Sequence, residues 1–426
     1  METGTPAPQA PAARVLYLSY DGMCDQLGAS QVLPYLFGLA ERGHEISLVS
    51  FEKPERTARE RAAVEEACTA AGIRWHPLLY HKRPAVLSSM YDVGRMASAA
   101  KRLHTEQRFD LVHCRSYLPA LVGLRMKRGL GVPFVFDMRG FWADERVDGR
   151  IWALSNPVFR AVFQYFKHKE AEFLAEAAHV VSLTREGRKI LLARRPNPSA
   201  GPPISVIPCC VDFGAFPPVS PKCRTPARAL LNISPDATVA AYLGSFGSWY
   251  LVDEMFNFFR VQLEREPESI FLIVSRDPAS LFEAAAVARG VPADRLVIRS
   301  ASRPEVPKLI AAADYGLFFI MPVFSKKASS PTKMGELLAL ELPIVTNGDV
   351  GDVSRIMNET GAGVVVEKFA DKAYRNALLE LEVLAPNMQQ WREAAHRWFD
   401  LDRGIGSYDA IYRSLLNSSP DKHHAA

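Results

Sequence analysis

The chain has 426 residues, of which 48% are hydrophobic and 23% are charged, the composition of an ordinary globular protein. This length allows two or three domains with substantial cores. No apolar run approaches the roughly 20 residues of a membrane-spanning helix, so none is expected. Residues 1–13 are rich in Pro and Ala and lack a basic start followed by an apolar segment. They predict a disordered tail and not a signal peptide.

The cysteines and the charge distribution limit the class of protein further. The six cysteines show no C-x-x-C or Cys/His zinc spacing, which predicts reduced, largely buried thiols in a cytoplasmic protein without a metal site. Residues 1–212 hold 28 Lys and Arg against 22 Asp and Glu, whereas the remaining chain holds 23 against 25. This basic first half suits peripheral contact with anionic lipid at the inner face of a membrane, or an anionic acceptor. An ordinary solvated surface is the alternative, and no nucleic-acid partner is expected.

The first half of the chain alternates strands and helices. Strands are expected at residues 15–20, 46–51, 74–79, 111–114, 134–138, 179–183 and 204–207. Helices are expected at residues 30–42, 57–71, 86–107, 118–127, 157–178 and 185–193. Repeated strand–helix units of this spacing predict a parallel sheet covered on both faces.

A segment rich in Pro, Cys and Ser, residues 208–235, interrupts the pattern and is the predicted domain boundary. A second series then begins, with strands expected at residues 238–243, 270–275, 296–299, 315–320, 343–346 and 363–366. Terminal helices are expected at residues 373–384, 388–399 and 408–416. The sequence therefore predicts an α/β fold of two doubly wound, Rossmann-like domains, residues 14–212 and 213–406, which face each other across a central cleft. Ligands in such sheets bind beyond the carboxyl ends of the strands.

One stretch, SSPTKMGELLALELPIVTN at residues 329–347, combines a helix start with a short buried strand. Ser330 is the predicted N-cap, with Pro331 at the first helical position. Lys333 then lies at the positive end of the helix dipole, where a cation is unfavourable unless an anion binds there. The helix start therefore predicts an anion site.

Thr332, Lys333 and Glu336 share one face of this helix, with the carboxylate about one turn beyond the start. A diphosphate at the helix start and a ribose diol on Glu336 would fit this spacing, and both charged side chains are expected to face the cleft. The alternative is a surface Lys–Glu pair, for which the order Lys before Glu is the weaker one.

Two other strand-to-helix loops contain glycines that would let a ligand approach the backbone. Gly22 and Gly28 precede Ser30, the predicted N-cap of the next helix. Gly244 and Ser245 follow the first strand of the second domain, where backbone N–H groups could meet phosphate oxygens. A plain tight turn is the alternative for each loop.

Polar and aromatic residues end two strands of the first half. His113 and Arg115 close one of them, and Arg139 lies in the sequence FDMRGFWADER, residues 136–146, that follows another. Such a mixture suits recognition of a polyhydroxylated molecule, with His113 and Arg115 opening onto the cleft. The alternatives are a structural histidine and a salt-linked loop.

Together these parts resemble the GT-B fold glycosyltransferases, specifically the large retaining family called family 4. The resemblance rests on SYDGMCDQLGASQ, VIPCCVD, YLGSFGSWY and, most specifically, SSPTKMGELLALELPIV. It implies that Glu336 binds the ribose hydroxyls, that Thr332 and Lys333 bind the diphosphate, and that residues 22–30 lie near the diphosphate and the acceptor. It also implies that a terminal helix, residues 408–416 of a segment 407–426, crosses back to the first domain.

The chain departs from the family pattern at three places. Ala328 stands where members commonly have a Glu that contacts the donor sugar, and residues 244–252 contain neither Arg nor Lys. Arg115 stands where a sugar-contacting His is often found. The resemblance therefore implies nucleoside diphosphate binding, and it names no particular base, sugar or acceptor.

The sequence predicts a hexosyltransferase that moves a hexose from a nucleoside diphosphate sugar to a hydroxyl of a glycan or lipid-linked acceptor, a step of polysaccharide biosynthesis. The resemblance implies retention of configuration. Lys333 and a cleft arginine, Arg115 or Arg139, are expected to stabilise the departing diphosphate without a metal or other cofactor. Lys326 and Lys327 are the next candidates for the cleft cation.

Two alternatives remain open on the sequence alone. A sugar-nucleotide epimerase shares the architecture and would take its acid and base from the region of His113 and Asp137. A catalytically silent nucleotide- or sugar-binding module is conceivable because position 328 lacks a Glu.

Overall fold

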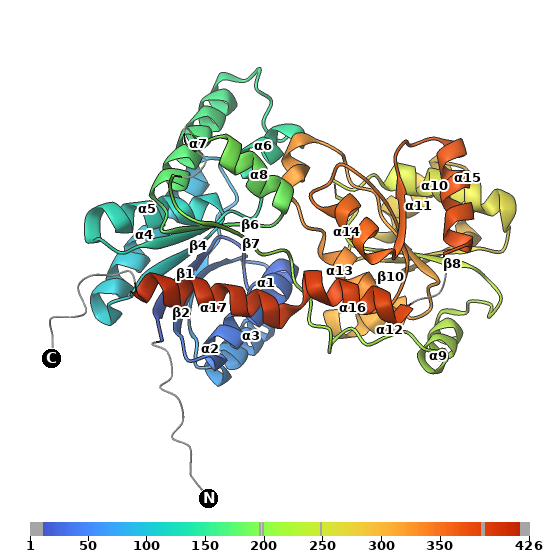
Figure 1. The fold of residues 1–426 in the computed structure, drawn as a ribbon, viewed down its shortest axis with the longest axis horizontal. Helices are drawn as coiled ribbons and strands as arrows, with labels where there is room; N and C mark the ends of the chain where they lie inside the picture. Colours follow the sequence, from blue (N-terminus) through green and yellow to red (C-terminus); the bar gives the residue numbers. More distant parts are fainter. Residues whose placement is uncertain (1–11, 196, 198–199, 248, 385–387, 418–426) are drawn as a thin grey trace, which may run out of the picture.

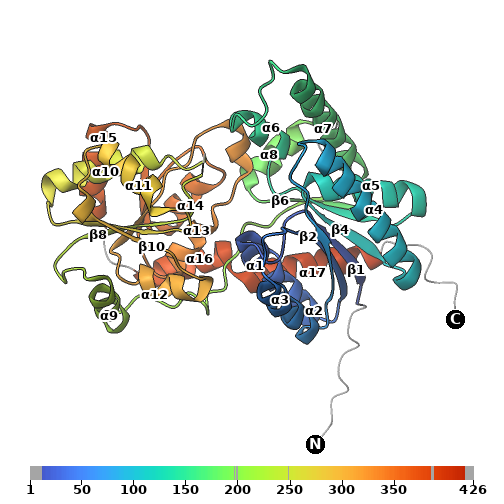
Figure 2. The ribbon, with the colours of Figure 1, turned by 180° about the vertical axis from the view of Figure 1, so that it is seen from behind.

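A computed structural model describes residues 12–195, 197, 200–247, 249–384 and 388–417. The expected tail, residues 1–13, lies outside these ranges except for its last two residues. The described chain forms two α/β lobes side by side (Figure 1), and the same two lobes are seen from behind in Figure 2.

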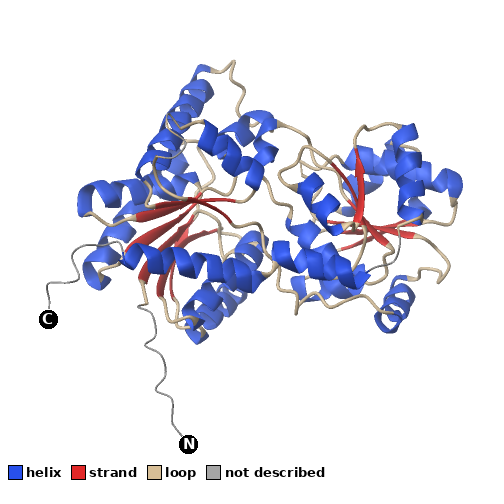
Figure 3. Cartoon of the chain, viewed as in Figure 1, coloured by secondary structure: helices blue, strands red, loops and turns tan. Residues whose placement is uncertain are grey.

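The first lobe is built on a seven-stranded sheet of order β3-β2-β1-β4-β5-β6-β7, in which neighbouring strands are parallel. Helices lie on both faces of the sheet (Figure 3). Its strands are β1 (Arg14–Ser19), β2 (Glu45–Glu52), β3 (Arg74–Leu79), β4 (Leu111–Arg115), β5 (Phe134–Asp137), β6 (His179–Ser182) and β7 (Ile204–Val206). Its helices are α1 (Gln26–Gln31), α2 (Leu33–Glu41), α3 (Ala58–Ala70), α4 (Leu87–Gln107), α5 (Tyr117–Leu130), α6 (Trp142–Asp148), α7 (Pro157–Glu176) and α8 (Arg185–Ala193).

The second lobe is built on a six-stranded parallel sheet of order β10-β9-β8-β11-β12-β13. Its strands are β8 (Val239–Leu243), β9 (Ile270–Val274), β10 (Leu296–Arg299), β11 (Tyr315–Leu317), β12 (Ile344–Asn347) and β13 (Gly363–Val366). The helices are α9 (Pro221–Leu231), α10 (Val252–Arg265), α11 (Ala279–Ala288), α12 (Val306–Ile310), α13 (Thr332–Ala339), α14 (Val353–Thr360), α15 (Asp371–Glu382), α16 (Met388–Phe399) and α17 (Leu401–Asn417). Short 3₁₀ turns are η1 (Ala293–Arg295), η2 (Arg303–Glu305) and η3 (Phe324–Ala328).

Strand β1 shows how each sheet divides its core. Leu16 and Leu18 belong to the cluster formed with α4, α5 and α7, whereas Val15 and Tyr17 belong to the cluster formed with α2 and α17. Successive strand residues point to opposite faces, and both faces of a parallel sheet are covered. That is why the strand is continuously apolar. The predicted class of two doubly wound, GT-B-type domains is confirmed.

The helix expected over residues 30–42 begins earlier and is interrupted. Val32, with φ −126° and ψ −65°, separates α1 from α2. Pro34 lies in the first turn of α2, and its ring would clash with the carbonyl of the residue four positions earlier if α1 continued through it. Because α1 already begins at Gln26, Ser30 lies inside this helix, and its prediction as an N-cap is wrong.

Other boundaries differ as well. The segment 208–235 contains α9, whose Ala227 and Leu231 join the second core. Residues 142–148 form α6 where a loop was expected, and β11 ends at Leu317 instead of residue 320. The domain ranges 14–212, 213–406 and 407–426 stay a prediction.

The terminal helices cross between the lobes as expected. Helix α16 packs against α13 and α14, and α17 packs against α2 of the first lobe. In Figures 1 and 2 α17 runs along the first lobe. It begins at residue 401, earlier than the predicted 408, and it buries one face of i, i+1, i+4, i+7, i+8 spacing: Gly404, Ile405, Tyr408, Ile411 and Tyr412.

Among the described residues, no helix has both the length and the apolar character that crossing a membrane requires.

Candidate active site

A cleft of about 1130 Å³ lies between the lobes. Its first wall comes from residues at the ends of β1, β4 and β5 and from α4 to α7, and its second wall from the loop after β8 and the segment leading into α13. The predicted residues Arg115, Arg139, Ser330 and Thr332 line it. The other predicted site residues lie outside its lining: Gly22, Gly28, His113, Gly244, Ser245, Lys333 and Glu336.

Helix α13 begins one residue later than expected. Pro331 is its N-cap, and no side chain caps its first turn. The Ser330 hydroxyl instead accepts the N–H of Cys209 at 3.1 Å, so the predicted Ser330 cap is wrong. Because residues 330–332 line the cleft, the uncapped N–H groups of this turn can bind an anion there.

Lys333 is enclosed by aromatic rings. Its side chain is 5% exposed, and Nζ lies 3.4 Å from the ring centroid of Tyr250 and 4.2 Å from that of Tyr242. Among the described residues Nζ has no hydrogen-bond partner. Burial lowers the pKa of Lys333 well below its usual range, an effect that the Glu336 carboxylate opposes. Cation–π attraction offsets part of the cost of this unpaired amine.

Gly244 makes room for Lys333. Its φ is +144°, and a Cβ there would lie 2.6 Å from Nζ of Lys333. The polar groups of this loop bind inside the protein: Tyr242 donates its hydroxyl to the Ser245 carbonyl at 2.6 Å, and the Phe246 N–H donates to Asp277. The loop around Gly244 and Ser245 therefore positions the lysine.

Glu336 is buried as well, and its Oε1 accepts a hydrogen bond from Nη1 of Arg303 at 2.7 Å. The expectation that Lys333 and Glu336 both face the open cleft is therefore wrong. Arg303 lies in η2, over the ring of Phe216, and orients the carboxylate through a charge-assisted bond. Sequence reasoning missed Arg303, because the only local signal is the Ser302 capping box, which indicates a helix start.

Arg115 and Arg139 meet at the ends of β4 and β5 around one carboxylate. Their Nη1 atoms lie 4.0 Å and 3.9 Å from Oδ2 of Asp137, and Arg115 also donates to Asp21 at 3.2 Å. Burial disfavours the charged form of Asp137, but Arg139, His113 and Arg115 hold its pKa below the usual value. The separations of about 4 Å are longer than hydrogen bonds, so both guanidinium groups can take a further acceptor.

His113 lies behind this pair. Its Nδ1 is 2.7 Å from the Tyr412 hydroxyl and its Nε2 is 3.4 Å from Asp137, while its ring stacks on Tyr17. Burial lowers the pKa of this imidazole although the Asp137 carboxylate opposes the shift. The expectation that His113 opens onto the cleft is wrong, because it connects β4 to α17. The Tyr408 hydroxyl in turn connects α17 to β5 by donating to Asp137 at 3.1 Å.

Gly22 and Gly28 are required by the fold of their own loop. A Cβ on Gly28 would lie 2.1 Å from the carbonyl oxygen of Gly22. The N–H groups of Met23 and Cys24 donate to the buried Glu52 carboxylate at 2.7 Å and 3.1 Å. An internal carboxylate thus occupies donors that were expected to face a phosphate.

Position 328 packs against the first lobe. Ala328 is 2% exposed, and its Cβ is 3.0 Å from the position a Cβ on Gly187 of α8 would take. The small side chains at 187 and 328 therefore let α8 and η3 pack closely. In the same turn, Lys326 pairs with Glu145 of α6 and lies 3.7 Å from the ring centroid of Trp249. Glu145 is thus a cleft-lining carboxylate held from the opposite lobe.

Lys326 lines the cleft, whereas Lys327 pairs with Asp349 outside its lining. Burial lowers the pKa of Lys326, although Glu145 opposes the shift. The chain has one Asp-x-Asp sequence, residues 400–402, also outside the cleft lining, where Asp400 caps α17 by accepting the N–H of Arg403. The described residues contain no group of three or more His, Cys, Asp or Glu arranged to hold a metal.

Comparison with known proteins agrees with this geometry. Residues 33–214 match the family model described as Glycosyltransferase Family 4. The solved structure of sucrose-phosphate synthase from Thermosynechococcus elongatus matches with a TM-score of 0.73 and 17% identity, covering 96% of this chain and all of that one. The chain therefore has the fold of the GT-B glycosyltransferases, and its residues 33–214 are similar to family 4.

Two further solved structures are similar to this chain. Anabaena Alr3699/HepE in complex with UDP-glucose matches with a TM-score of 0.68 and 12% identity over 96% of this chain and 100% of that one. WaaG, a glycosyltransferase involved in lipopolysaccharide biosynthesis, matches with a TM-score of 0.61 and 16% identity over 93% and 99%. No curated protein sequence matches this chain.

Proposed function

We propose that this glycosyltransferase transfers a hexose from a nucleoside diphosphate sugar to a hydroxyl of a glycan or lipid-linked acceptor, with retention of configuration. The charge of the cleft carries this proposal. Six basic side chains line the cleft against two acidic ones: Lys82, Arg115, Arg125, Arg139, Arg146 and Lys326 against Asp21 and Glu145. A cleft of this sign attracts an anionic donor and stabilises an anionic leaving group.

The diphosphate is proposed to bind between the start of α13 and the Arg115–Arg139 pair on the facing wall. Both groups line the same cleft and both can take further acceptors. The solved HepE structure with UDP-glucose, which has the same fold, supports a sugar nucleotide as donor. Ribose would bind on Glu336, which requires the Arg303 bond to be shared or exchanged.

Charge builds on the diphosphate as the sugar leaves. Arg115, Arg139, the N–H groups of α13 and Lys333 would stabilise that charge, so no metal is needed in the proposal. Glu145 is proposed to contact sugar hydroxyls in place of the carboxylate missing at position 328. Its position in the cleft lining, fixed by Lys326, supports this role.

The acceptor side of the cleft favours the lipid-linked class. Its first wall is rich in aromatic rings: Tyr20, Tyr80, Trp142, Trp152, Phe159 and Phe166. Apolar side chains stay exposed at the start of α4, where Leu87 is 62% and Met90 is 66% exposed. Exposed apolar groups beside basic ones suit an anionic lipid surface, so the enzyme would act at the inner face of a membrane.

A thermal-shift panel of UDP, GDP, ADP and dTDP, followed by product analysis with the matching labelled sugar nucleotide, tests the proposal. Release of the nucleoside diphosphate with transfer of the sugar is the expected result. An altered sugar without release would make the protein an epimerase, and binding without turnover would make it a silent module.

A further inference from the structure

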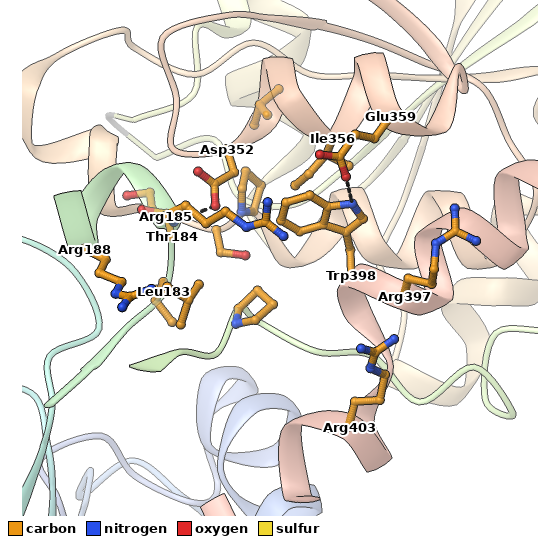
Figure 4. Close-up of a pocket in the computed structure, with 16 residues that line it drawn as sticks. Leu183, Thr184, Arg185, Arg188, Asp352, Ile356, Glu359, Arg397, Trp398 and Arg403 are labelled. Carbon is orange, nitrogen blue, oxygen red and sulfur yellow. Dashed lines mark hydrogen bonds between the residues drawn. The ribbon is translucent and has the colours of Figure 1, made fainter. Parts of the chain in front are cut away.

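A second pocket, of about 520 Å³, lies beside the segment that leads from β7 into the second lobe. Side chains from α8, α14, α16 and α17 surround it (Figure 4). Leu183 and residues 329–331 line both this pocket and the cleft, so they form the wall between the two.

Four arginines line this pocket: Arg185 and Arg188 of α8, Arg397 of α16 and Arg403 of α17. Within the described ranges, none of the four guanidinium groups pairs with a carboxylate at salt-bridge distance. The Arg185 guanidinium lies 4.5 Å from the ring centroid of Trp398, and Figure 4 shows it extended along that ring. Figure 4 shows Arg185 and Arg188 on one side of the pocket and Arg397 and Arg403 on the other.

The two acids in the pocket lining are already engaged. The Asp352 carboxylate accepts the backbone N–H groups of Arg185 and Glu186 at 2.7 Å and 3.2 Å. Glu359 accepts the indole N–H of Trp398 at 3.0 Å. Four arginines against two hydrogen-bonded carboxylates leave the pocket with a positive charge that a bound anion would compensate.

We infer that this pocket binds a phosphate-bearing small molecule. The planar fork of a guanidinium group matches two phosphate oxygens, and several arginines around one pocket hold a doubly charged phosphate better than isolated lysines would. Ser329 and Ser330 line the pocket too and can bind the hydroxyls of a phosphorylated sugar. The ligand class is therefore a phosphate monoester such as a sugar phosphate, with free phosphate as the simpler source of the same chemistry.

The pocket joins parts of both lobes. Arg185 and Arg188 lie in the first lobe, whereas Arg397 lies on α16, which packs against α13 and α14. A ligand held by these arginines bridges the lobes and contacts residues 329–331 from the side opposite the cleft. Occupation of this pocket is therefore expected to change nucleotide affinity in the cleft through the shared wall, an effect that rests on the proposed function.

Isothermal titration calorimetry with glucose 6-phosphate, inorganic phosphate and glucose tests the inference. The wild-type protein is compared with Arg397→Gln/Arg403→Gln and with Arg59→Gln, an exposed arginine of α3, as the matched control. Titrations are run with and without the nucleoside diphosphate that fills the cleft. Glucose 6-phosphate is expected to bind, with the double variant weaker by about tenfold or more and the control unchanged.

All three proteins should melt alike, because the substituted side chains are exposed and unpaired within the described structure. Equal binding of free phosphate would identify phosphate itself as the ligand. Equal affinity in the double variant and the control, or no binding of either phosphate compound by the wild type, would overturn the inference. A failure of every nucleotide to bind would refute the proposed function but leave this comparison of variants intact.

Discussion

Lys333 and Glu336 lie one helical turn apart, and the free protein satisfies their charges in different ways. The carboxylate has a 2.7 Å ion pair with Arg303. The amine lies against aromatic rings and has no hydrogen-bond partner among the described residues. The two residues should therefore respond differently to substitution. In the proposed binding mode, Glu336 would hold the ribose in ground and transition states alike. Lys333, whose Nζ has no hydrogen-bond partner among the described residues, would gain one when an anion binds.

Glu336→Ala is expected to weaken donor binding while leaving kcat nearly unchanged. Two charge-assisted bonds to a ribose diol are worth about 1.5–3 kcal/mol each, and their loss from both states appears as lost affinity. Nucleotide affinity by calorimetry and steady-state kinetics measure the split. Glu380→Ala on the exposed surface of α15 is the control. Wild-type affinity in Glu336→Ala would remove this residue from the site.

Lys333→Met is expected to stabilise the free protein and to weaken nucleotide binding. Methionine fills the aromatic cage without an unpaired charge, for a gain of about 1–3 kcal/mol near neutral pH. The pKa of Lys333 in the folded state lies below its value in the unfolded state. At pH values between these two, the unfolded chain binds more protons than the folded one. The wild type therefore gains stability as pH rises through that window, and the advantage of the variant shrinks toward about pH 10. Melting curves of both proteins across pH measure this. A wild type that is more stable than the variant, by a margin independent of pH, would contradict the account.

At the scale of elements, α17 connects the second lobe to the first by packing along the first lobe against α2. Its Tyr408 and Tyr412 hydroxyls bind Asp137 and His113 directly behind the cleft arginines. Helix α17 therefore supports the carboxylate that positions Arg115 and Arg139. Close packing reinforces the contact, since a Cβ on Gly38 of α2 would lie 2.3 Å from Ile405 of α17.

Tyr408→Phe is expected to lower the free energy of unfolding by about 1–3 kcal/mol, because it leaves a buried carboxylate with one bond fewer. Tyr165→Phe makes the same change on a side chain that is 45% exposed and should cost almost nothing. Urea unfolding of both variants measures the difference. Equal stability of the two would show that the Tyr408 hydroxyl contributes little to holding Asp137.

The sequence predicted the helices and strands better than it predicted the contacts of individual side chains. Repeated βα spacing sufficed for both sheets, because continuous apolar strands can only be buried on two faces. It failed at Ser30, because α1 already begins at Gln26, and at Ser330, because Pro331 is the N-cap of α13. It also failed for His113 and Glu52, since no local signal shows that Tyr412 or the Met23 N–H lies across the fold from them. Arg303 and the aromatic cage of Lys333 are long-range contacts of the same kind.

At the scale of the whole molecule, the lobes touch through η3 and around α8. Thr184 donates its hydroxyl to the Lys327 carbonyl at 2.7 Å, and Asp352 accepts N–H groups at the start of α8. Ser325 donates its N–H to Asp148 at 2.9 Å. These polar contacts come before and after residues 329–331 in the sequence. The relative position of the two lobes therefore also determines where this segment, the wall shared by the two pockets, lies.

The central claim is that the basic cleft releases a nucleoside diphosphate from a sugar nucleotide. The most direct measurement is diphosphate release from a panel of sugar nucleotides, with acceptor lipid extract, in excess EDTA, for the wild type and Arg139→Gln. Release from one donor is expected, and EDTA should leave it intact. Arg139→Gln should lower this release by roughly 10²–10³-fold, and Arg59→Gln should leave it unchanged. No release from any donor, or release that EDTA abolishes and Mg²⁺ restores, would contradict it.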